Sequence, residues 1–250
     1  MDFTLNRYRQ LIKCLTDNGY HFQTFEEFSS HAKDKAVVLR HDVDKLPQKA
    51  LEIAIIENKM GINASYYFRI VKESNEPEII KRIIELGHEI GYHYEDLTMA
   101  KGDIDLAINM FEKNLKYFRT FYPVKTICMH GSPMSKWDNR QLWKKYNYKD
   151  FSIIAEPYFD IDYNRVLYLT DSGRSWNKTG AVIRDKVKTN LSYDINNTVD
   201  LIDKISKSLL PDQLIINTHP QRWSEPGMFW LKELVFQNLK NQVKRLYVRS

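Results

Sequence analysis

The chain has 250 residues, of which 43% are hydrophobic and 28% charged, so it is long enough for one substantial core and within the size of a single α/β barrel. Its net charge is +5 and its basic residues are scattered, which excludes a dense nucleic-acid-binding arm, and no uncharged stretch is long enough to cross a bilayer. Two cysteines exclude a disulfide framework, and we expect a cytoplasmic protein without nucleic-acid partners or stable membrane insertion.

The N-terminal residues 1–34 are expected to form a helical extension. Apolar residues recur at helical spacing over residues 3–18, and Gly19 supplies a stop signal. A short helix is predicted over residues 25–30. The segment lacks the apolar core of a signal peptide, and no linker-like stretch follows it. We therefore expect one domain over residues 1–250, with this extension packed on it.

Strands and helices alternate from residue 36 onward. Apolar runs predict strands, amphipathic runs predict helices, and Gly61 and Gly87 end two of the helices. The first half is expected to contain strands over 36–44, 63–71, 88–95 and 125–131, and helices over 47–59, 75–86 and 103–121. This alternation, in units of about 25–30 residues, predicts right-handed parallel crossovers and an α/β fold.

The second half of the chain is less regular. Strands are predicted over 152–156, 166–171, 181–187 and 214–219, and helices over 139–146, 198–209 and 228–246. Nearly every predicted strand is apolar until its end, where ionisable side chains follow: Asp42, Asp44, Arg69, His93, His130, Glu156, Asp171, Arg184, Asp185 and His219. Parallel strands bring their carboxyl ends to one rim, where barrel enzymes carry their chemistry, so we expect these side chains to meet in one pocket.

Residues 40–44 (RHDVD) hold two carboxylates at the end of the first of these strands. Residues two apart in a strand share a face, so Asp42 and Asp44 are expected to point the same way. Neighbouring carboxylates repel each other, which favours a cation between them or a raised pKa on one of them. The alternative is that Asp44 caps the helix beginning at Pro47, which would leave Asp42 unexplained.

Residues 88–93 (HEIGYH) look superficially like the H-E-x-x-H motif of zinc proteases. The second histidine comes one residue late, however, and Gly91 favours a strand over a helix. In a strand His88 and His93 lie on opposite faces, so at most one of them reaches the site. His93, at the strand end, is the candidate, and His88 is expected to make a structural hydrogen bond.

Two further histidines follow predicted strands. His130 leads into a turn, so a metal ligand and a histidine bonded to the turn backbone remain alternatives, while His219, before Pro220, could be a ligand or a general acid. One carboxylate with two or three imidazoles and no cysteine suits a catalytic zinc site with an open position. The sequence contains no P-loop, no G-x-G-x-x-G and no G-x-S-x-G motif, so nucleotide-cofactor and serine-esterase chemistry lack support.

Taken in order, these motifs resemble those of the polysaccharide deacetylase family (carbohydrate esterase family four, with the NodB-homology fold). Residues 40–44 stand where the family has Thr-Phe-Asp-Asp, and residues 64–68 (ASYYF) look like its Ala-Thr-Phe-Phe. Residues 87–93 (GHEIGYH) are similar to its Gly-His-Glu-Ile-Gly-Asn-His, and residues 217–219 (NTH) to the motif that supplies its catalytic histidine. The resemblance covers residues 36–246 and implies a distorted (β/α)7-type TIM-like barrel with mostly parallel strands.

The resemblance also implies roles for individual residues. Asp42 would be the general base and His219 the general acid. Asp44 and His93 would be ligands of a divalent metal, with Zn²⁺ preferred.

One position departs from the family pattern. The family's second metal-binding histidine falls at Leu97 in this chain. His130 is the preferred replacement as third ligand, with Glu95 and Asp96 as alternatives. His130 also stands where the family has an arginine, whose role Arg40 or Arg69 could take.

The implied activity is metal-dependent removal of an N-acetyl group from an amino sugar. Residues 129–133 (MHGSP) and 218–223 (THPQRW) look like a bacterial subgroup associated with surface-polysaccharide (O-antigen) biosynthesis, so the expected partner is an N-acetylated sugar or glycan precursor. The residues expected to contact it are Arg40, Arg69, Glu156, Arg184 and Trp223. Trp137, Trp176 and Trp223 could each stack on a sugar ring or pack under a loop.

Two other functions remain open. One is a C–N hydrolase acting on a small non-sugar amide, for which the altered third ligand leaves room. The other is a catalytically inactive glycan-binding barrel, which the absence of a histidine at Leu97 favours.

Overall fold

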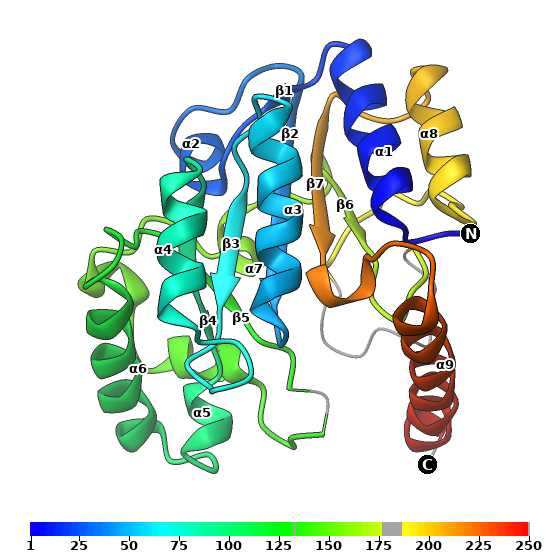
Figure 1. Ribbon diagram of the computed structural model, residues 1–250. Helices are drawn as coiled ribbons and strands as arrows, with labels where there is room; N and C mark the ends of the chain where they lie inside the picture. The colour runs from blue at the N-terminus through cyan, green and yellow to red at the C-terminus, as the bar shows by residue number, and fades with distance from the viewer. Residues whose placement is uncertain (133, 177–186, 250) are drawn as a thin grey trace.

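The computed structural model describes residues 1–132, 134–176 and 187–249. Within these residues, parallel strands form a curled half-barrel surrounded by helices (Figure 1). The strands are β1 (His21–Phe22), β2 (Ala36–Val43), β3 (Ser65–Phe68), β4 (Glu89–Tyr94), β5 (Ile127–Met129), β6 (Leu167–Thr170) and β7 (Gln213–Thr218). Their order is β5-β4-β3-β2-β7-β6, with β1 beside the start of β2. This confirms the predicted fold class, an α/β fold with a distorted (β/α)7-type barrel.

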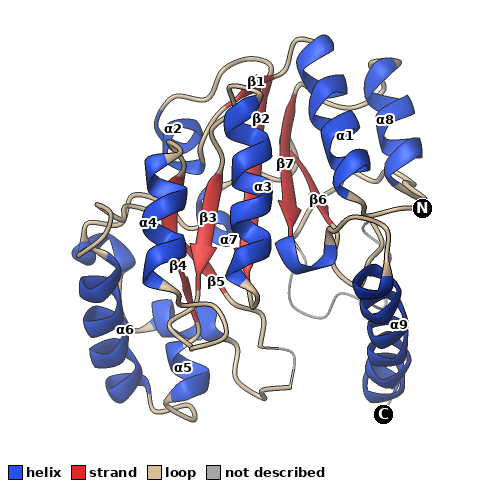
Figure 2. Ribbon diagram, in the orientation of Figure 1, coloured by secondary structure: helices blue, strands red, loops and turns tan. Residues whose placement is uncertain are grey.

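Helices cover the sheet on both faces (Figure 2). They are α1 (Leu5–Asp17), α2 (Phe25–Ser30), α3 (Pro47–Lys59), α4 (Pro77–Glu85), α5 (Asp96–Met99), α6 (Ile104–Phe118), α7 (Pro157–Asp160), α8 (Thr198–Ser206) and α9 (Met228–Arg249), with 3-10 turns η1 (Asn139–Lys144), η2 (Tyr148–Phe151) and η3 (Pro220–Arg222). The helix α3 packs against α4 and β2, and α1 packs against α8. None of the described helices is both long and apolar enough to cross a lipid bilayer.

Local sequence signals set several of the helix boundaries. The side chain of Thr4 accepts a hydrogen bond from the Arg7 amide at the start of α1, and Thr24 with Glu27 forms a capping box at the start of α2. Proline 47 occupies the first turn of α3, where its missing N–H costs nothing. The helix ends before Gly61, whose φ of 71° is a left-handed conformation that glycine adopts readily.

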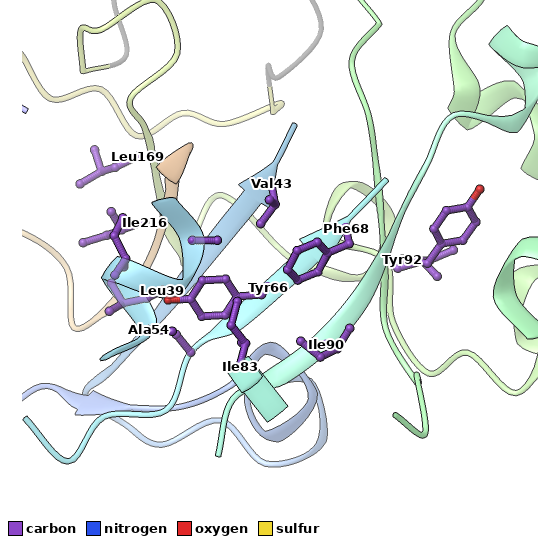
Figure 3. Packing of buried hydrophobic residues seen from close by; sticks show 14 of the residues in the cluster. Leu39, Val43, Ala54, Tyr66, Phe68, Ile83, Ile90, Tyr92, Leu169 and Ile216 are labelled. Carbon is purple, nitrogen blue, oxygen red and sulfur yellow. The ribbon is translucent and has the colours of Figure 1, made fainter. Parts of the chain in front are cut away.

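Side chains of the strands alternate between two buried faces of the sheet. On the face under α3 and α4, Leu39, Tyr66 and Phe68 pack with Ala54 and Ile83 (Figure 3). The opposite, inner face carries a second apolar cluster that includes Val38, Tyr67, Cys128, Tyr168 and Ile215. Because successive strand residues alternate, β2 turns Arg40 and Asp42 to the inner face and His41 to the helix-covered face.

A buried polar cluster lies between β2, α1 and α3. The Glu57 carboxylate accepts a hydrogen bond from Tyr8 and another from Tyr66 (2.5 Å), and it lies 2.8 Å from His41 Nε2. The Nδ1 atom of His41 lies 2.6 Å from Thr218 Oγ1. Burial would raise the pKa of Glu57, but the charge of His41 and its hydrogen bond lower that pKa below the ordinary value. The cluster therefore joins α1 to the barrel through an ionised carboxylate.

The segment that follows η2 runs beside the edge strand β5. A strand was predicted over residues 152–156, but only an isolated bridge between Thr126 and Ala155 is present. The prediction is wrong because Glu156 caps α7 by accepting a hydrogen bond from the Tyr158 amide, and Pro157 has no N–H to donate to a strand.

The remaining predicted elements are present, with ends that differ by a few residues. The helix predicted over 139–146 is the 3-10 turn η1, and the strand predicted over 181–187 falls mainly outside the described residues. Five short elements of the described residues were not predicted: β1, α5, α7, η2 and η3. Each has at most four residues, which is too short to establish a periodic pattern. Since β1 pairs with β2, part of the N-terminal segment belongs to the sheet itself.

Candidate metal centre

Four polar side chains meet at the carboxyl ends of the parallel strands. Asp44 follows β2 directly, His93 lies near the end of β4, and His130 and His219 follow β5 and β7. Leu46, and not Asp44, occupies the N-cap position of α3, and no side chain caps that helix. Asp44 therefore does not cap α3, and the alternative interpretation of this residue is wrong.

The carboxylate of Asp44 is surrounded by three imidazoles. The Nε2 atoms of His93 and His130 lie 3.6 and 3.5 Å from Asp44 Oδ1, and Nε2 of His219 lies 3.8 Å from Asp44 Oδ2. Among the described residues, Asp44 Oδ1 is buried and has no hydrogen-bond partner. A buried carboxylate oxygen without a partner is costly, so this atom points to a missing cation or donor.

Each of the three imidazoles is oriented by an acceptor on its far side. The Nδ1 atom of His93 lies 2.9 Å from the Cys128 carbonyl oxygen, that of His130 lies 2.8 Å from Glu95 Oε2, and that of His219 lies 2.7 Å from Asp171 Oδ1. An acceptor at Nδ1 favours the tautomer that carries its proton there. For His93 and His130, the lone pair of Nε2 is then free and faces Asp44.

Asp44 differs from the neighbouring carboxylates because it has no arginine partner among the described residues. Three neighbouring carboxylates each have an arginine within 3.0 Å, in the pairs Asp42–Arg40, Glu95–Arg69 and Asp171–Arg222. Within the described part of the chain, Asp44 pairs with no arginine or lysine. Burial would raise its pKa, but the neighbouring imidazoles of His93, His130 and His219 hold the pKa of Asp44 well below its ordinary value.

These donors fit a divalent cation. Asp44, His93 and His130 each offer a ligand atom, and the three atoms lie within 4.8 Å of one another. One carboxylate with imidazole nitrogens is the donor set that zinc prefers in catalytic sites. A second possible set, Asp42, His93 and Cys128, shares His93. It is less favourable because Arg40 lies 3.0 Å from Asp42 and would repel a cation there.

Asp42 lies beneath this group and is 1% exposed. Its Oδ2 atom accepts hydrogen bonds from Arg40 and Asn217, both at 3.0 Å, while Oδ1 has no partner among the described residues. Burial would raise the pKa of Asp42, but the charge of Arg40, followed by those of His93 and His219, lowers it. Asp42 is therefore an ionised carboxylate with one free oxygen.

Asp171 holds His219 in place, a pairing that no local motif indicated. Asp171 Oδ2 accepts a hydrogen bond from the His219 amide (3.0 Å) and another from the indole of Trp223 (2.8 Å). Burial would raise the pKa of Asp171, but the charges of Arg222 and His219 lower it to about 2. The two partners are 48 residues apart, so only the position of Asp171 at a strand end hinted at the site.

Three residues expected to contact substrate are buried and form hydrogen bonds within the chain. Arg40 is fully buried and holds Asp42, and Glu156 is fully buried and accepts hydrogen bonds from the Met129 and Tyr158 amides. Trp223 is fully buried against Asp171.

The other expected contacts differ in position. Arg69 is partly exposed and pairs with Glu95, and Arg184 lies outside the described residues. Trp176 is buried and donates to Thr198. Trp137 packs so closely on the backbone of Gly102 that a Cβ there would lie 2.4 Å from its ring. The buried Trp176 therefore offers no exposed face for stacking on a sugar.

The residues next to Leu97 form bonds with other parts of the chain. Glu95 holds His130 Nδ1, and Asp96 accepts hydrogen bonds from Tyr92 and Asn114. Leu97 is buried in the apolar core. The geometry favours His130 over Glu95 and Asp96 as the third donor. His88, on the opposite face of β4, lies 3.0 Å from the Ala54 carbonyl oxygen, as expected for a structural role.

Asp96 gives a test of this buried environment. Burial raises its pKa to about 7, against the lowering effect of hydrogen bonds from Tyr92 and Asn114. A raised pKa in the folded state means that stability is lost as the pH rises through that value. In the wild type, the unfolding free energy should therefore fall between about pH 5.5 and about pH 8.5. In Asp96→Asn, which carries no titrating carboxylate at this position, we expect this fall to be smaller by about 2 kcal/mol. Urea titrations at both pH values measure this, and the same loss in wild type and variant would contradict it.

Comparison with known proteins gives only structural likenesses. No family model matches the chain, and no curated protein matches it. The solved structures it resembles include a CE4 family pseudoenzyme from Bacillus anthracis, with 16% identity, a TM-score of 0.47 and coverage of 86% of this chain and 63% of the other. Another is the CE4 domain of a multidomain xylanase from the hindgut metagenome of Trinervitermes trinervoides, with 16% identity, a TM-score of 0.38 and coverage of 84% and 85%. The chain thus spans less than two thirds of the length of the Bacillus anthracis protein.

Proposed function

We propose that this protein is a metal-dependent hydrolase of the polysaccharide deacetylase type that removes an N-acetyl group from an amino sugar. The observation that carries this proposal is the arrangement of Asp44, His93 and His130. Their donor atoms converge, each imidazole is oriented from behind, and Asp44 lacks any other cationic partner in the described chain. Such orientation by second partners is typical of metal-binding histidines.

In this proposal Asp44, His93 and His130 hold the cation, with Zn²⁺ preferred for this donor set. When bound there, the cation would supply Lewis acidity toward an amide carbonyl and a water molecule. Asp42 would accept the proton of the attacking water at Oδ1, because Arg40 and Asn217 already occupy Oδ2. Arg40 also keeps Asp42 ionised and ready to act as a base.

His219 would return a proton to the leaving amine from Nε2. Asp171 holds Nδ1 at 2.7 Å and, as an ionised carboxylate, stabilises the protonated imidazole, as the acid of a catalytic triad does. The two proton-transferring groups then act from different strands, with Asp42 in β2 and His219 after β7.

The substrate remains the part of the proposal that depends on the sequence resemblance. It would be an N-acetylated sugar precursor of a surface polysaccharide such as O-antigen, handled in the cytoplasm. Arg69 is 19% exposed, and it contacts the Asp44 backbone oxygen at 3.1 Å. We propose that Arg69 contacts the substrate, because its side chain is partly exposed next to Asp44.

Metal content tests the proposal most directly. We expect about one divalent ion per chain in wild type after chelation, reloading and desalting, and loss of about 10- to 100-fold in metal affinity for Asp44→Asn and for His130→Ala. His31→Ala is the matched control, because His31 is exposed and outside the site. Elemental analysis and competition with a chelating dye provide the readout.

Acetate release then separates the possible reactions. N-acetylated nucleotide sugars and small amides would be compared as substrates for the loaded enzyme. Wild-type protein without bound metal would overturn the hydrolytic mechanism. Full metal occupancy with no acetate from either substrate class would point to an inactive glycan-binding protein instead, and turnover of small amides alone to a non-sugar C–N hydrolase.

A further inference from the structure

The C-terminal helix α9 packs on the body through its polar side. Trp230 donates its indole N–H to the Asp2 carbonyl (2.9 Å), Glu233 pairs with Lys45 (3.6 Å), and Asn241 donates to the Gly173 carbonyl (2.9 Å). Gln237 is 7% exposed. These positions follow one another by three or four residues and therefore lie on one side of the helix.

The apolar side of α9 faces away from the body. Met228, Leu231, Val235 and Leu239 follow the same spacing about half a turn away and are 68%, 50%, 52% and 56% exposed. Phe229 and Phe236 widen this surface at 40% and 50% exposure. Soluble proteins rarely expose a contiguous apolar patch of this kind unless it binds something. We call these six residues the α9 apolar face.

The charges on α9 are almost all positive. Lys232 and Lys240 are exposed; by helical spacing Lys232 lies within the apolar face and Lys240 lies at its edge, 4.4 Å above the Phe236 ring. The only acid in the sequence of residues 228–249 is Glu233, which pairs with Lys45 on the body side. The exposed side of the described helix thus combines apolar residues with cations and offers no carboxylate.

The apolar residues and lysines of α9 favour one of two possible binding partners, a second copy of the chain or a lipid surface. A second copy packed on the same face would bring lysines against lysines, with no acid on the exposed side to pair with them. An anionic lipid surface instead accepts the apolar side chains and meets the lysines with phosphate groups. We therefore propose that α9 is an interfacial helix that docks the protein on a membrane surface rich in anionic lipid.

Docking through α9 would also bring the candidate metal centre near that surface. The helix begins soon after η3, which follows His219, and it lies at the end of the molecule toward which the strand arrows point (Figure 1). Lys45, the residue after Asp44, pairs with Glu233, and Lys49 of α3 lies 5.2 Å from the Phe229 ring. The proposal itself does not require the hydrolase function.

Vesicle co-sedimentation of the full chain tests this docking. We expect binding to phosphatidylcholine vesicles with about 30% phosphatidylglycerol to be at least about 10-fold tighter than to pure phosphatidylcholine, and to weaken as salt is added. Leu231→Glu with Leu239→Glu is expected to reduce binding at least about 10-fold. Leu106→Glu with Leu209→Glu is the matched control, since these leucines are 49% and 55% exposed elsewhere on the surface. Lys232→Gln with Lys240→Gln should reduce the preference for anionic vesicles.

Several outcomes would overturn the proposal. These are no binding of the wild-type protein, equal binding by the α9 variant, or equal loss in the control variant. A dimer in sedimentation velocity that Leu231→Glu with Leu239→Glu dissociates, without vesicle binding, would show that a second copy covers the face instead. Circular dichroism checks that the variants are folded, and metal content is expected to be the same in wild type and α9 variants, which separates this result from failure of the proposed function.

Discussion

Replacing Asp42 by Asn is expected to lower kcat/KM for acetate release about 10²- to 10⁴-fold while the protein keeps its metal. The amide oxygen of the replacement can still accept the hydrogen bonds that Arg40 and Asn217 donate to Oδ2. It cannot accept a proton from water at neutral pH, however. Kinetics of acetate release and elemental analysis of the same preparation measure the two quantities.

The Asp42 prediction has a matched control and a clear contrary result. Asp17→Asn alters an exposed carboxylate that pairs with Lys13 on α1, far from the strand ends, and is expected to leave both quantities unchanged. Retention of more than about a tenth of the activity by Asp42→Asn would show that another group accepts the proton. Loss of metal along with activity would instead make Asp42 a ligand, as in the set with His93 and Cys128.

The largest loss of stability is expected from Glu57→Ala. Removing this carboxylate leaves His41, Tyr8 and Tyr66 without their shared partner in a site with no exposure to solvent. Breaking a buried ionic network by removing one member costs about 3–5 kcal/mol. The midpoint of urea unfolding, monitored by tryptophan fluorescence, reports this loss.

A neighbouring glutamate in the same helix provides the control. Glu52 pairs with Lys49 at 2.7 Å but is 42% exposed, so Glu52→Ala is expected to cost no more than about 1 kcal/mol. The pH dependence adds a second check. Because the folded state lowers the pKa of Glu57, its contribution is present at neutral pH and lost as the pH falls through that pKa. Wild type should therefore lose more stability in acid than Glu57→Ala; an equal loss would contradict the cluster's role.

Much of the fold follows from local sequence signals. The alternation of apolar strands and amphipathic helices between residues 36 and 131 predicted the parallel α/β arrangement, because βαβ units of this length have one favoured handedness. Two-residue periodicity also predicted that His88 and His93 lie on opposite faces of β4. The structure has them so, with His88 beside Ala54 and His93 beside Asp44. The elements of the less regular second half were harder to predict, because single capping residues and prolines determine where its short elements begin and end.

Contacts between distant segments could not be read from the sequence. Nothing near Asp171 indicates that it holds His219, and nothing near Arg40 shows that it is buried against Asp42 and not exposed to substrate. The burial of Arg40, Glu156 and Trp223 was not predicted for this reason. The position of a residue in a strand predicts at which end of the barrel its side chain lies. Its burial depends instead on which loop residues cover it.

The sequence by itself determined the parallel α/β fold and the set of ionisable residues at the carboxyl ends of its strands, because strand and helix periodicity and chain direction are local properties. Only the tertiary structure decided which of these side chains face one another around Asp44, which carboxylates have arginine partners, and which side of α9 is exposed. Those outcomes depend on the packing of segments far apart in the chain, and a one-dimensional pattern carries no record of which surfaces will be covered.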